Sequence, residues 1–514
     1  MKLIAISFFI LQSLSAIQGA QSVFSQNDPL SDLSRILEEA RAQSGITGMS
    51  VAVLHKGKLI FAEGFGKRND YDPFMVETLM PIASLTKAFT AAAIGELVAE
   101  GMVDWDVTPV SKYLPEFELQ DPAFTAQLTF QDLLSHRTGF PQVDLGWFWN
   151  TEPRRELIKR LKYVEAESKL RSYVLYNNVM FAVAGEAAAN VVNISYEDLV
   201  REKVLVPLGL NNSGFSAKEM SQRSNYAMPY EAKSLKDAQN GKFSQLPLDN
   251  MATAWAPAGD MYSNVIDLVK WGQTIIHLGE QDGKQVLNKD SITEILSGQS
   301  ISIKERRTPE FGATAAYGLG WMLDTYKGNI IYHHTGRIDG FVSNLALFPD
   351  SDLVVAHLAN VETAILPFYS AYHIADELLG LYKSQNWIDV AINGTQNMFK
   401  NIARVAKGNF PKRIENKSST RELNEFAGDY SNPIYGDISI HLERSIDDKE
   451  ELYIKFRVFE GKLEHYHYDS FSTVMGHAAL VLGELVTFVT GQDGNVSGFQ
   501  IELHARIEVF KRKE

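Results

Sequence analysis

Residues 81–97 read PIASLTKAFTAAAIGEL and place a serine, Ser84, three positions before a lysine, Lys87. Alanine, leucine and glutamate favour helix, so we expect a helix that begins near Ser84 and ends before Gly101. Positions i and i+3 share a helix face, which puts the two side chains one turn apart. A serine hydroxyl needs a neighbouring base to act as a nucleophile, and a lysine whose pKa is lowered by burial can be that base. Because such a pair is common by chance, its meaning depends on the rest of the chain.

The composition is that of a large globular protein. A chain of 514 residues is too long for one hydrophobic core, so we expect two or more domains. The formal net charge of -14 argues against a nucleic acid or an anionic membrane as the main partner. The chain has no cysteine, which excludes disulfides, thiolate nucleophiles and cysteine-ligated metals. We find no sequence motif for a metal or a nucleotide and expect no cofactor.

The first 20 residues, MKLIAISFFILQSLSAIQGA, have one lysine, an apolar run and then small residues. This order is typical of a secretory signal peptide, and the run is too short to span a membrane comfortably. We therefore expect a secreted protein, extracellular or periplasmic, whose mature chain has no membrane span.

Hydrophobic patterns after the leader alternate between strand and helix. They predict a sheet completed by both ends of residues 28–382, flanked by helices and interrupted by a helical subdomain, which is a mixed α/β architecture. The expected strands lie at 49–54, 59–64, 318–323, 330–334, 343–348 and 353–358, and the expected helices at 28–42, 128–134, within 151–206, and at 367–381.

The C-terminal part of the chain changes character twice. Residues 383–420 are polar and indicate a linker with one short helix. From 421 to 514, short segments with period two alternate with turns, which predicts an all-β sandwich or barrel.

Two further clusters offer partners for Ser84. In YNN at 176–178, Tyr176 can donate or accept a proton beside a lysine, and Asn178 offers an amide for a substrate. In HTGR at 334–337, a glycine at the end of an expected strand lets a substrate backbone approach the strand edge. The N–H group of the residue after that glycine can join the N–H of Ser84 in an oxyanion hole.

The order S-x-x-K, Y-x-N and K/H-[TS]-G resembles the three-motif signature of the penicillin-recognising serine hydrolases. The resemblance covers residues 28–382 and is strongest for the branch with class C β-lactamases, D-alanyl-D-alanine carboxypeptidases, D-aminopeptidases and β-lactamase-fold esterases. Three supporting stretches also look like the family: GMSVAVLHKGKLIFAEGFG, LTFQDLLSHRTGFP and APAGDMYSNVIDLVKW. The stretches GDYSNPIYGDISI and LEHYHYDSF resemble the lipocalin-like β-barrel appended to some of these peptidases.

The resemblance implies a role for each matching residue. Ser84 would be the acyl-forming nucleophile, Lys87 its activator, and Tyr176 the group that passes the proton to the leaving group. The implied substrate-binding residues are Asn178, His334, Thr335, Gly336 and Arg337, with the backbone N–H groups of Ser84 and Arg337 as the oxyanion hole. No metal ligand is implied.

His334 departs from the lysine that β-lactamases carry at this position. Histidine has an ordinary pKa near 6.5 and is mostly neutral at pH 7, so it is a weaker anchor for a substrate carboxylate. This difference favours an aminopeptidase-like or esterase-like activity. Arg337 either restores the missing charge or is a solvated arginine at the rim.

The main hypothesis is therefore a secreted serine hydrolase that forms an acyl-enzyme on Ser84 and cleaves amide, peptide (including D-amino-acid) or ester bonds of a small molecule or short peptide. Two alternatives stay open: an acyltransferase or transesterase for a small metabolite, and a non-catalytic binding or sensor protein on the same fold. For the barrel, gating of the cleft, a limit on substrate size, homo-oligomer contacts and a purely stabilising role are all open.

Overall fold

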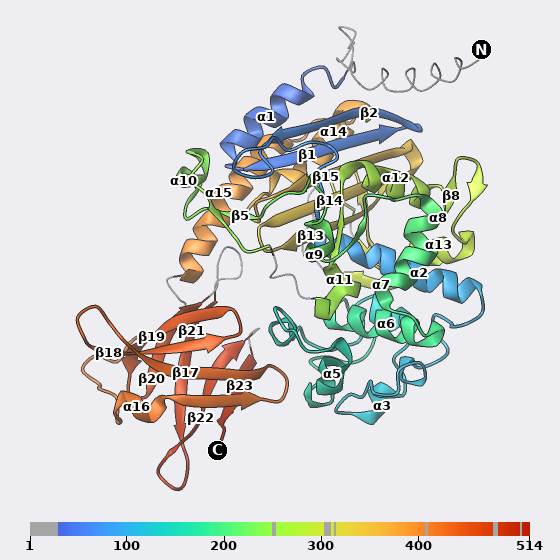
Figure 1. The fold of residues 1–514 in the computed structure, drawn as a ribbon. Coiled ribbons are helices and arrows are strands. Elements are labelled where there is room, and N and C mark those ends of the chain that lie inside the picture. Colours follow the sequence, from blue (N-terminus) through green and yellow to red (C-terminus); the bar gives the residue numbers. More distant parts are fainter. Residues whose placement is uncertain are drawn as a thin grey trace, which may run out of the picture.

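The computed structural model describes residues 29–248, 253–302, 310–312, 315–406, 410–475, 482–503 and 506–514. The expected signal peptide at 1–20 lies outside the described residues. The chain forms a large α/β unit and, below it in Figure 1, a β-barrel. Among the described residues no single helix has the length and hydropathy to cross a membrane, and one pair, Asn178–Val192 with Tyr196–Leu208, reaches that level only with a bend of 81°.

The α/β unit is built on one eight-stranded antiparallel sheet with the order β10-β11-β12-β13-β14-β15-β1-β2. The N-terminal hairpin pairs with β15, from Met49 opposite Ala359 to His55 opposite Leu353. Both ends of the region therefore complete one sheet, as predicted. The strands are β1 (Gly48–His55), β2 (Lys58–Gly66), β10 (Ser300–Ser302), β11 (Ala315–Tyr317), β12 (Met322–Tyr326), β13 (Asn329–Ile338), β14 (Phe341–Phe348) and β15 (Leu353–Ala359).

The expected strand at 318–323 is misplaced, because regular pairing begins only at Met322. Gly320 has φ +80°, and a side chain there would come within 2.7 Å of the Lys87 carbonyl oxygen. The backbone at 318–320 therefore runs close to the helix that carries Lys87 instead of pairing in the sheet.

Helices cover both faces of the sheet (Figure 1). On one face lie α1 (Leu33–Gln43), α14 (Leu366–Leu379) and α15 (Trp387–Ala406), which share a buried apolar cluster with the sheet. On the other lie α2 (Thr86–Ala99) and α12 (Val265–Ile276). The helical subdomain between β2 and β10 includes α4 (Phe130–Leu134), α5 (Arg154–Ile158), α6 (Asn178–Val192), α7 (Tyr196–Val200) and α11 (Ala256–Gly259).

The interpretation of 383–420 as a linker with one short helix needs correction. Residues 387–406 form α15, a helix of 20 residues that packs against α14. Its buried side chains include Trp387, Ile388 and three more at four-residue steps from Trp387, namely Ala391, Thr395 and Phe399, the spacing of a helix face that meets a core. Polar residues such as Asn393, Gln396 and Asn397 separate these positions and concealed the pattern in the composition.

A buried ion pair joins these two helices to the sheet, and its removal gives a first prediction. Asp376 is 3% exposed and accepts hydrogen bonds from Tyr326, Lys327 and Trp387. Asp376→Ala leaves the Lys327 ammonium buried without its carboxylate and is expected to lower the free energy of unfolding by about 3–5 kcal/mol. Denaturant unfolding at pH 7 measures the difference.

The neighbouring Glu377 is the matched control for that prediction. Its carboxylate pairs with Lys383, whose side chain is 64% exposed. Exposed pairs contribute little, so Glu377→Ala is expected to cost under about 1 kcal/mol. Equal losses in the two variants would contradict the buried-pair assignment.

The C-terminal unit is a closed eight-stranded antiparallel barrel, which confirms the expected β-barrel. Closure is made by β16, which pairs with both β17 and β23. The strands are β16 (Gly428–Asn432), β17 (Gly436–Arg444), β18 (Glu450–Phe456), β19 (Phe459–His467), β20 (Ser470–Met475), β21 (Leu482–Thr490), β22 (Val496–Leu503) and β23 (Arg506–Arg512). Packed aromatic rings such as Phe426, Tyr430 and Phe499 fill its interior.

Candidate active site

Ser84 lies in a tightly held turn. It sits in the 3-10 turn η1 (Ala83–Leu85), directly before α2, so the predicted helix is confirmed. Ala83 has φ +48°, in the left-handed region that favours glycine. The turn is held by Ile82 N–H, which donates to Met261 O (2.9 Å), and by the Thr86 hydroxyl, which donates to Ala83 O (2.7 Å). A strained backbone persists only where its surroundings fix it in this way.

Lys87 is fully buried and its amine has three polar neighbours. Nζ lies 3.0 Å from Ser84 Oγ, 2.7 Å from Asn178 Oδ1 and 2.8 Å from Ala258 O. The last two are carbonyl oxygens, which only accept hydrogen bonds. A neutral amine therefore donates its two N–H bonds to them and directs its lone pair toward the Ser84 hydroxyl. This is the arrangement that a general base requires.

The charge state of Lys87 agrees with that geometry. Burial lowers the pKa of the Lys87 amine from 10.5 to about 7, partly opposed by the negative charge of Asp144. Near neutral pH a large fraction of the amine is therefore unprotonated and able to take a proton. The aromatic ring of Tyr176 lies 4.9 Å from Nζ and shields it from water.

Tyr176 completes the group around the serine. It precedes α6, and its phenol is hydrogen-bonded to Ser84. Burial raises the pKa of the Tyr176 phenol well above its usual value, so the group stays protonated at neutral pH. Its ring packs against His136, with ring centroids 4.1 Å apart. A protonated phenol beside Ser84 can deliver a proton to a departing group, whereas Lys87 is the better base.

Asn178 is placed beside Lys87 and is 9% exposed. Its Oδ1 accepts from Lys87, and its Nδ2 donates to Asp144 Oδ2 (2.8 Å). Both polar atoms of the amide are thus committed to protein groups. In this structure Asn178 orients the lysine, and the expected contact with a substrate amide would need one of these bonds to be shared.

His334 lies on β13 but is buried, with 1% exposure. Its Nδ1–H donates to Thr335 O (2.7 Å), and its Nε2 accepts from the Tyr317 hydroxyl (2.9 Å). Burial lowers the pKa of the imidazole to about 3. The ring is therefore neutral and supports Tyr317, and it supplies no positive charge for a carboxylate.

The strand that carries the HTG triplet has an open edge beside Ser84. Strand β12 pairs with β13 only as far as His333, so none of the described strands pairs with residues 334–338 on that side. Thr335 is partly exposed there. An unpaired strand edge offers backbone groups to an extended peptide.

Gly336 allows this edge to reach the nucleophile. A Cβ atom at Gly336 would lie 2.2 Å from Ile82 O and 2.2 Å from Ser343 Oγ. No side chain fits, so the glycine brings β13 against the turn that holds Ser84. The adjoining N–H of Arg337 as half of an oxyanion hole stays a prediction that fits this close approach.

The Arg337 side chain extends away from the serine. Its guanidinium donates to Glu362 O and lies 5.9 Å from the ring centroid of Phe368. Burial lowers the pKa of the guanidinium. Arg337 is therefore not a solvated arginine at the rim, which was one of the two alternatives from the sequence, because these protein groups hold its side chain.

Three residues of the site were not predicted from the sequence: His136, Asp144 and Tyr317. The His136 Nδ1 accepts from Asn177 N–H (3.0 Å), and burial lowers the pKa of its imidazole well below the usual value. It lies within LTFQDLLSHRTGFP, so that stretch was a usable signal. Asp144 and Tyr317 belong to none of the motifs or family-like stretches, so the sequence alone did not indicate them.

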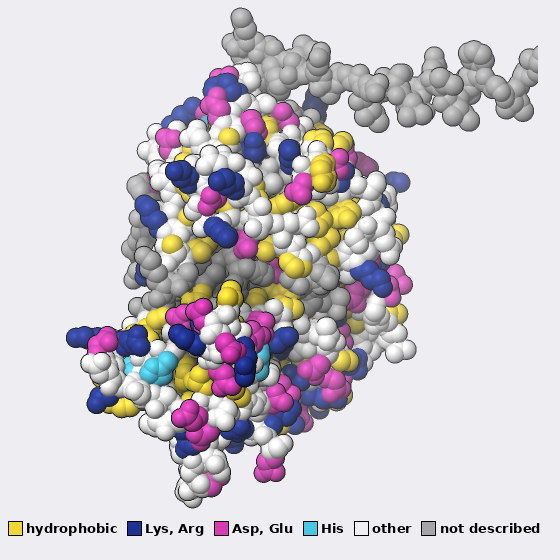
Figure 2. Space-filling model, turned by 60° about the vertical axis from the view of Figure 1, so that its left-hand side comes forward, with side chains coloured by type: hydrophobic (Ala, Val, Ile, Leu, Met, Phe, Trp, Pro, Cys, Tyr) yellow, Lys and Arg dark blue, Asp and Glu magenta, His cyan; other side chains and the backbone are white. Residues whose placement is uncertain are grey.

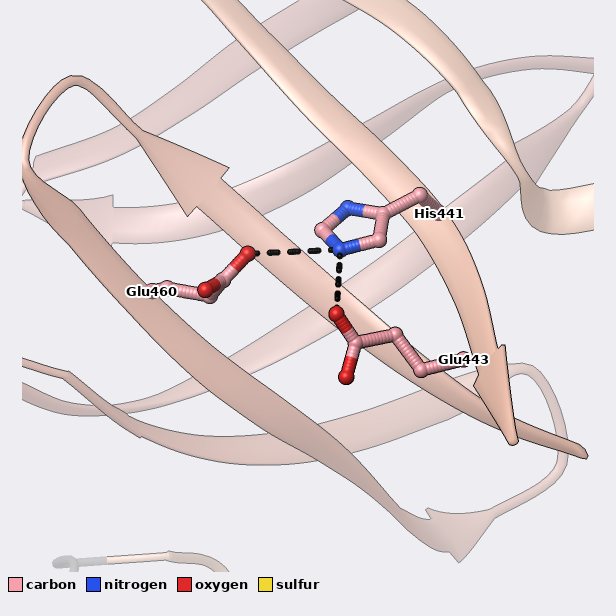
Figure 3. Close-up of side chains that lie close together, drawn as sticks. All are labelled: His441, Glu443 and Glu460. Carbon is pink, nitrogen blue, oxygen red and sulfur yellow. Dashed lines mark hydrogen bonds and ion pairs between the residues drawn. The ribbon is translucent and has the colours of Figure 1, made fainter. Parts of the chain in front are cut away.

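One cluster with the spacing of metal ligands lies on the barrel. His441 Nε2 is 3.4 Å from Glu443 Oε1 and 3.3 Å from Glu460 Oε1 (Figure 3). All three side chains are between one third and one half exposed, and none contacts the groups around Ser84.

On the face in Figure 2, basic and acidic side chains are interspersed.

Comparison with known proteins identifies families that match most of the chain. The family model described as Beta-lactamase matches residues 33–377, and one described as a domain of unknown function (DUF3471) matches residues 412–513. The chain is 27% identical over 436 residues to the Unguisins hydrolase ungD' of Aspergillus campestris, covering 80% of this chain and 78% of that protein. It is 24% identical over 354 residues to the D-alanyl-D-alanine-carboxypeptidase/endopeptidase AmpH of Escherichia coli, covering 66% and 86%.

A solved structure, the octameric penicillin-binding protein homologue from Pyrococcus abyssi, has the same fold. It superposes with a TM-score of 0.59 and 22% identity, covering 93% of this chain and all of that one. The first family match spans more than half of the chain. The chain therefore belongs to the Beta-lactamase family within the penicillin-recognising serine hydrolases, with a C-terminal β-barrel appended.

Proposed function

We propose that this protein is a serine hydrolase that cleaves amide bonds through an acyl-enzyme on Ser84. The observation that carries the proposal is the position of the Lys87 amine, which lies within hydrogen-bond distance of two carbonyl acceptors and 3.0 Å from Ser84 Oγ. When the amine is neutral, its two N–H bonds satisfy the carbonyls and its lone pair is left for the hydroxyl proton. A buried amine with a pKa of about 7 is suited to general-base catalysis at neutral pH.

In the acylation step, Lys87 takes the hydroxyl proton as Ser84 Oγ forms a bond to the substrate carbonyl carbon. The backbone N–H groups of Ser84 and Arg337 bind the oxyanion. The C–N bond then breaks, and the proton held by Lys87 passes through the Tyr176 hydroxyl to the leaving amine, so that Lys87 is neutral again in the acyl-enzyme. A water molecule then gives a proton to Lys87 as it attacks the acyl carbon, and this proton returns to Ser84 Oγ as the ester bond breaks and the acid is released.

For the substrate we propose amides of D-amino acids or internal bonds of short peptides. The relatives named a hydrolase and a carboxypeptidase/endopeptidase support a peptide-like substrate. The neutral, buried His334 argues against strong recognition of a free C-terminal carboxylate. The open edge of β13 suits an extended backbone on both sides of the cleaved bond. We further propose secretion, which rests on residues 1–20.

A turnover panel tests the proposal. It contains D- and L-amino-acid p-nitroanilides, matched esters, nitrocefin, and short peptides with free or amidated C-termini. We expect turnover of D-amino-acid amides. Peptides with an amidated C-terminus should be cleaved at least as fast as those with a free carboxylate. The Ser84→Ala variant should show no turnover. No turnover of any substrate by the wild type, or equal rates in Ser84→Ala, would reject the proposal. Products formed with an added amine distinguish acyl transfer from hydrolysis.

A further inference from the structure

Residues 144–149, here called the 144–149 segment, connect the catalytic lysine to the barrel. At its start, Asp144 is 6% exposed and binds Asn178, which in turn binds Lys87. At its end, Trp149 packs edge-on against Phe459 of the barrel, with ring centroids 4.4 Å apart. The segment has only one short helical turn, Asp144–Gly146, and that turn has no side-chain cap.

Arg457 of the barrel binds this segment through its backbone. It lies in the turn between β18 and β19, with φ +57°. Its guanidinium donates to Leu145 O (2.6 Å), Phe148 O (2.5 Å) and Gly146 O (2.8 Å). A fourth bond to Tyr435 O (2.9 Å) ties the same guanidinium to the barrel. A guanidinium has five N–H donors, enough for four carbonyl groups, whereas a lysine ammonium has only three.

The two surfaces also approach closely. A Cβ atom at Gly146 would lie 2.9 Å from Ile434 O in the turn between β16 and β17. Buried residues of the barrel and of the α/β unit form one continuous apolar cluster. The barrel is therefore packed against the loop that supplies Asp144.

We propose that the barrel is a working part of the active site: Arg457 holds the 144–149 segment so that Asp144 fixes Asn178 and, through it, Lys87. Arg457 is thus a positioning residue, which acts on the amine through the 144–149 segment and Asn178. The inference rests on the proposed function of Ser84 and Lys87. It gives the barrel a role in catalysis, which differs from the gating, size-limiting, oligomer-forming and purely stabilising roles considered from the sequence.

The test compares Arg457→Ala with the wild type by the rate at which a fluorophosphonate labels Ser84 between pH 5 and 9. Labelling in the variant is expected to slow by up to about 100-fold, the cost of a small misplacement of catalytic groups. The acid limb of the rate profile is expected to move to lower pH, because the negative charge of Asp144 raises the pKa of Lys87. Hydrogen exchange at 144–149 is expected to be faster.

Two further variants separate positioning from general damage. Asp144→Asn removes the charge directly, so it should shift the acid limb in the same direction, and adding Arg457→Ala should shift it no further. Arg512→Ala is the matched control. Arg512 also donates to two carbonyls, Glu425 O (2.8 Å) and Ala427 O (2.6 Å), but both lie before the first barrel strand. This variant should label like the wild type.

The inference is overturned if Arg457→Ala has the labelling rate and acid limb of Arg512→Ala. It is also overturned if the rate falls while the acid limb and the exchange at 144–149 stay those of the wild type. A wild type that is not labelled rejects the proposed function instead, and hydrogen exchange at 144–149 and 178 then decides the positioning claim by itself.

Discussion

Replacing Lys87 by methionine is expected to lower kcat/KM by about 10²–10⁴-fold, the usual contribution of a general base. The buried amine lies 3.0 Å from Ser84 Oγ, and in its neutral form it can accept the hydroxyl proton. In the wild type, kcat/KM should rise with pH through about 7, because Lys87 acts only when unprotonated and its pKa is about 7. The variant should lose that limb. A limb near pH 7 that survives in Lys87→Met would contradict the assignment.

The same variant should change how stability depends on pH. In the folded protein Lys87 loses its proton near pH 7, whereas in the unfolded chain it holds the proton to about 10.5. The unfolded state therefore binds more protons between these values, and the Lys87 contribution makes the folded state more stable as pH rises through this window. Lys87→Met does not titrate. The free energy of unfolding, measured by urea at pH 7 and 9, should rise more in the wild type than in the variant.

Gly336→Ala is expected to reduce kcat/KM by about 100-fold or more, because β13 must move away from the Ser84 turn. The added Cβ would lie 2.2 Å from Ile82 O, a backbone atom, and 2.2 Å from Ser343 Oγ. The Ser343 hydroxyl is itself bonded to Ile82 O (2.6 Å) and has little freedom to give way. Steady-state kinetics on the amide substrate measures the loss.

Gly328→Ala is the control at the other end of β13. A Cβ there meets nothing within 4 Å, and φ is +86°. Its expected cost is local backbone strain of about 1–2 kcal/mol with unchanged kcat/KM. Equal losses of activity in the two variants would mean that Gly336 matters only through general stability.

Local patterns were enough to predict the elements with strong periodicity. The helix after Ser84, the hairpin predicted at 49–64, β14 and β15 all lie where apolar spacing placed them. The failures have physical causes. Residues 318–320 are apolar enough for a strand, but the approach to Lys87 O sets their conformation. In α15 the buried positions are separated by polar residues, which hid the length of the helix.

The catalytic residues could be predicted because they form three short motifs whose order along the chain matches a known family. The residues that position them could not be predicted. Asp144 and Tyr317 come from separate parts of the chain, and only the fold shows that they bind Asn178 and His334. Likewise, only the fold shows that Arg457 binds the segment that carries Asp144. Asn178 shows the limit most clearly: the motif assigns it to the substrate, but the structure commits its amide to Lys87 and Asp144.

The most direct measurement is the mass of the protein after reaction with a fluorophosphonate at pH 8, followed by peptide mapping. The phosphonyl group should add once, with loss of fluoride, to the peptide that contains Ser84. Ser84→Ala should gain no mass, and Lys87→Met should react far more slowly than the wild type. A wild type that gains no mass, or an adduct on a residue other than Ser84, would contradict a nucleophilic serine activated by Lys87.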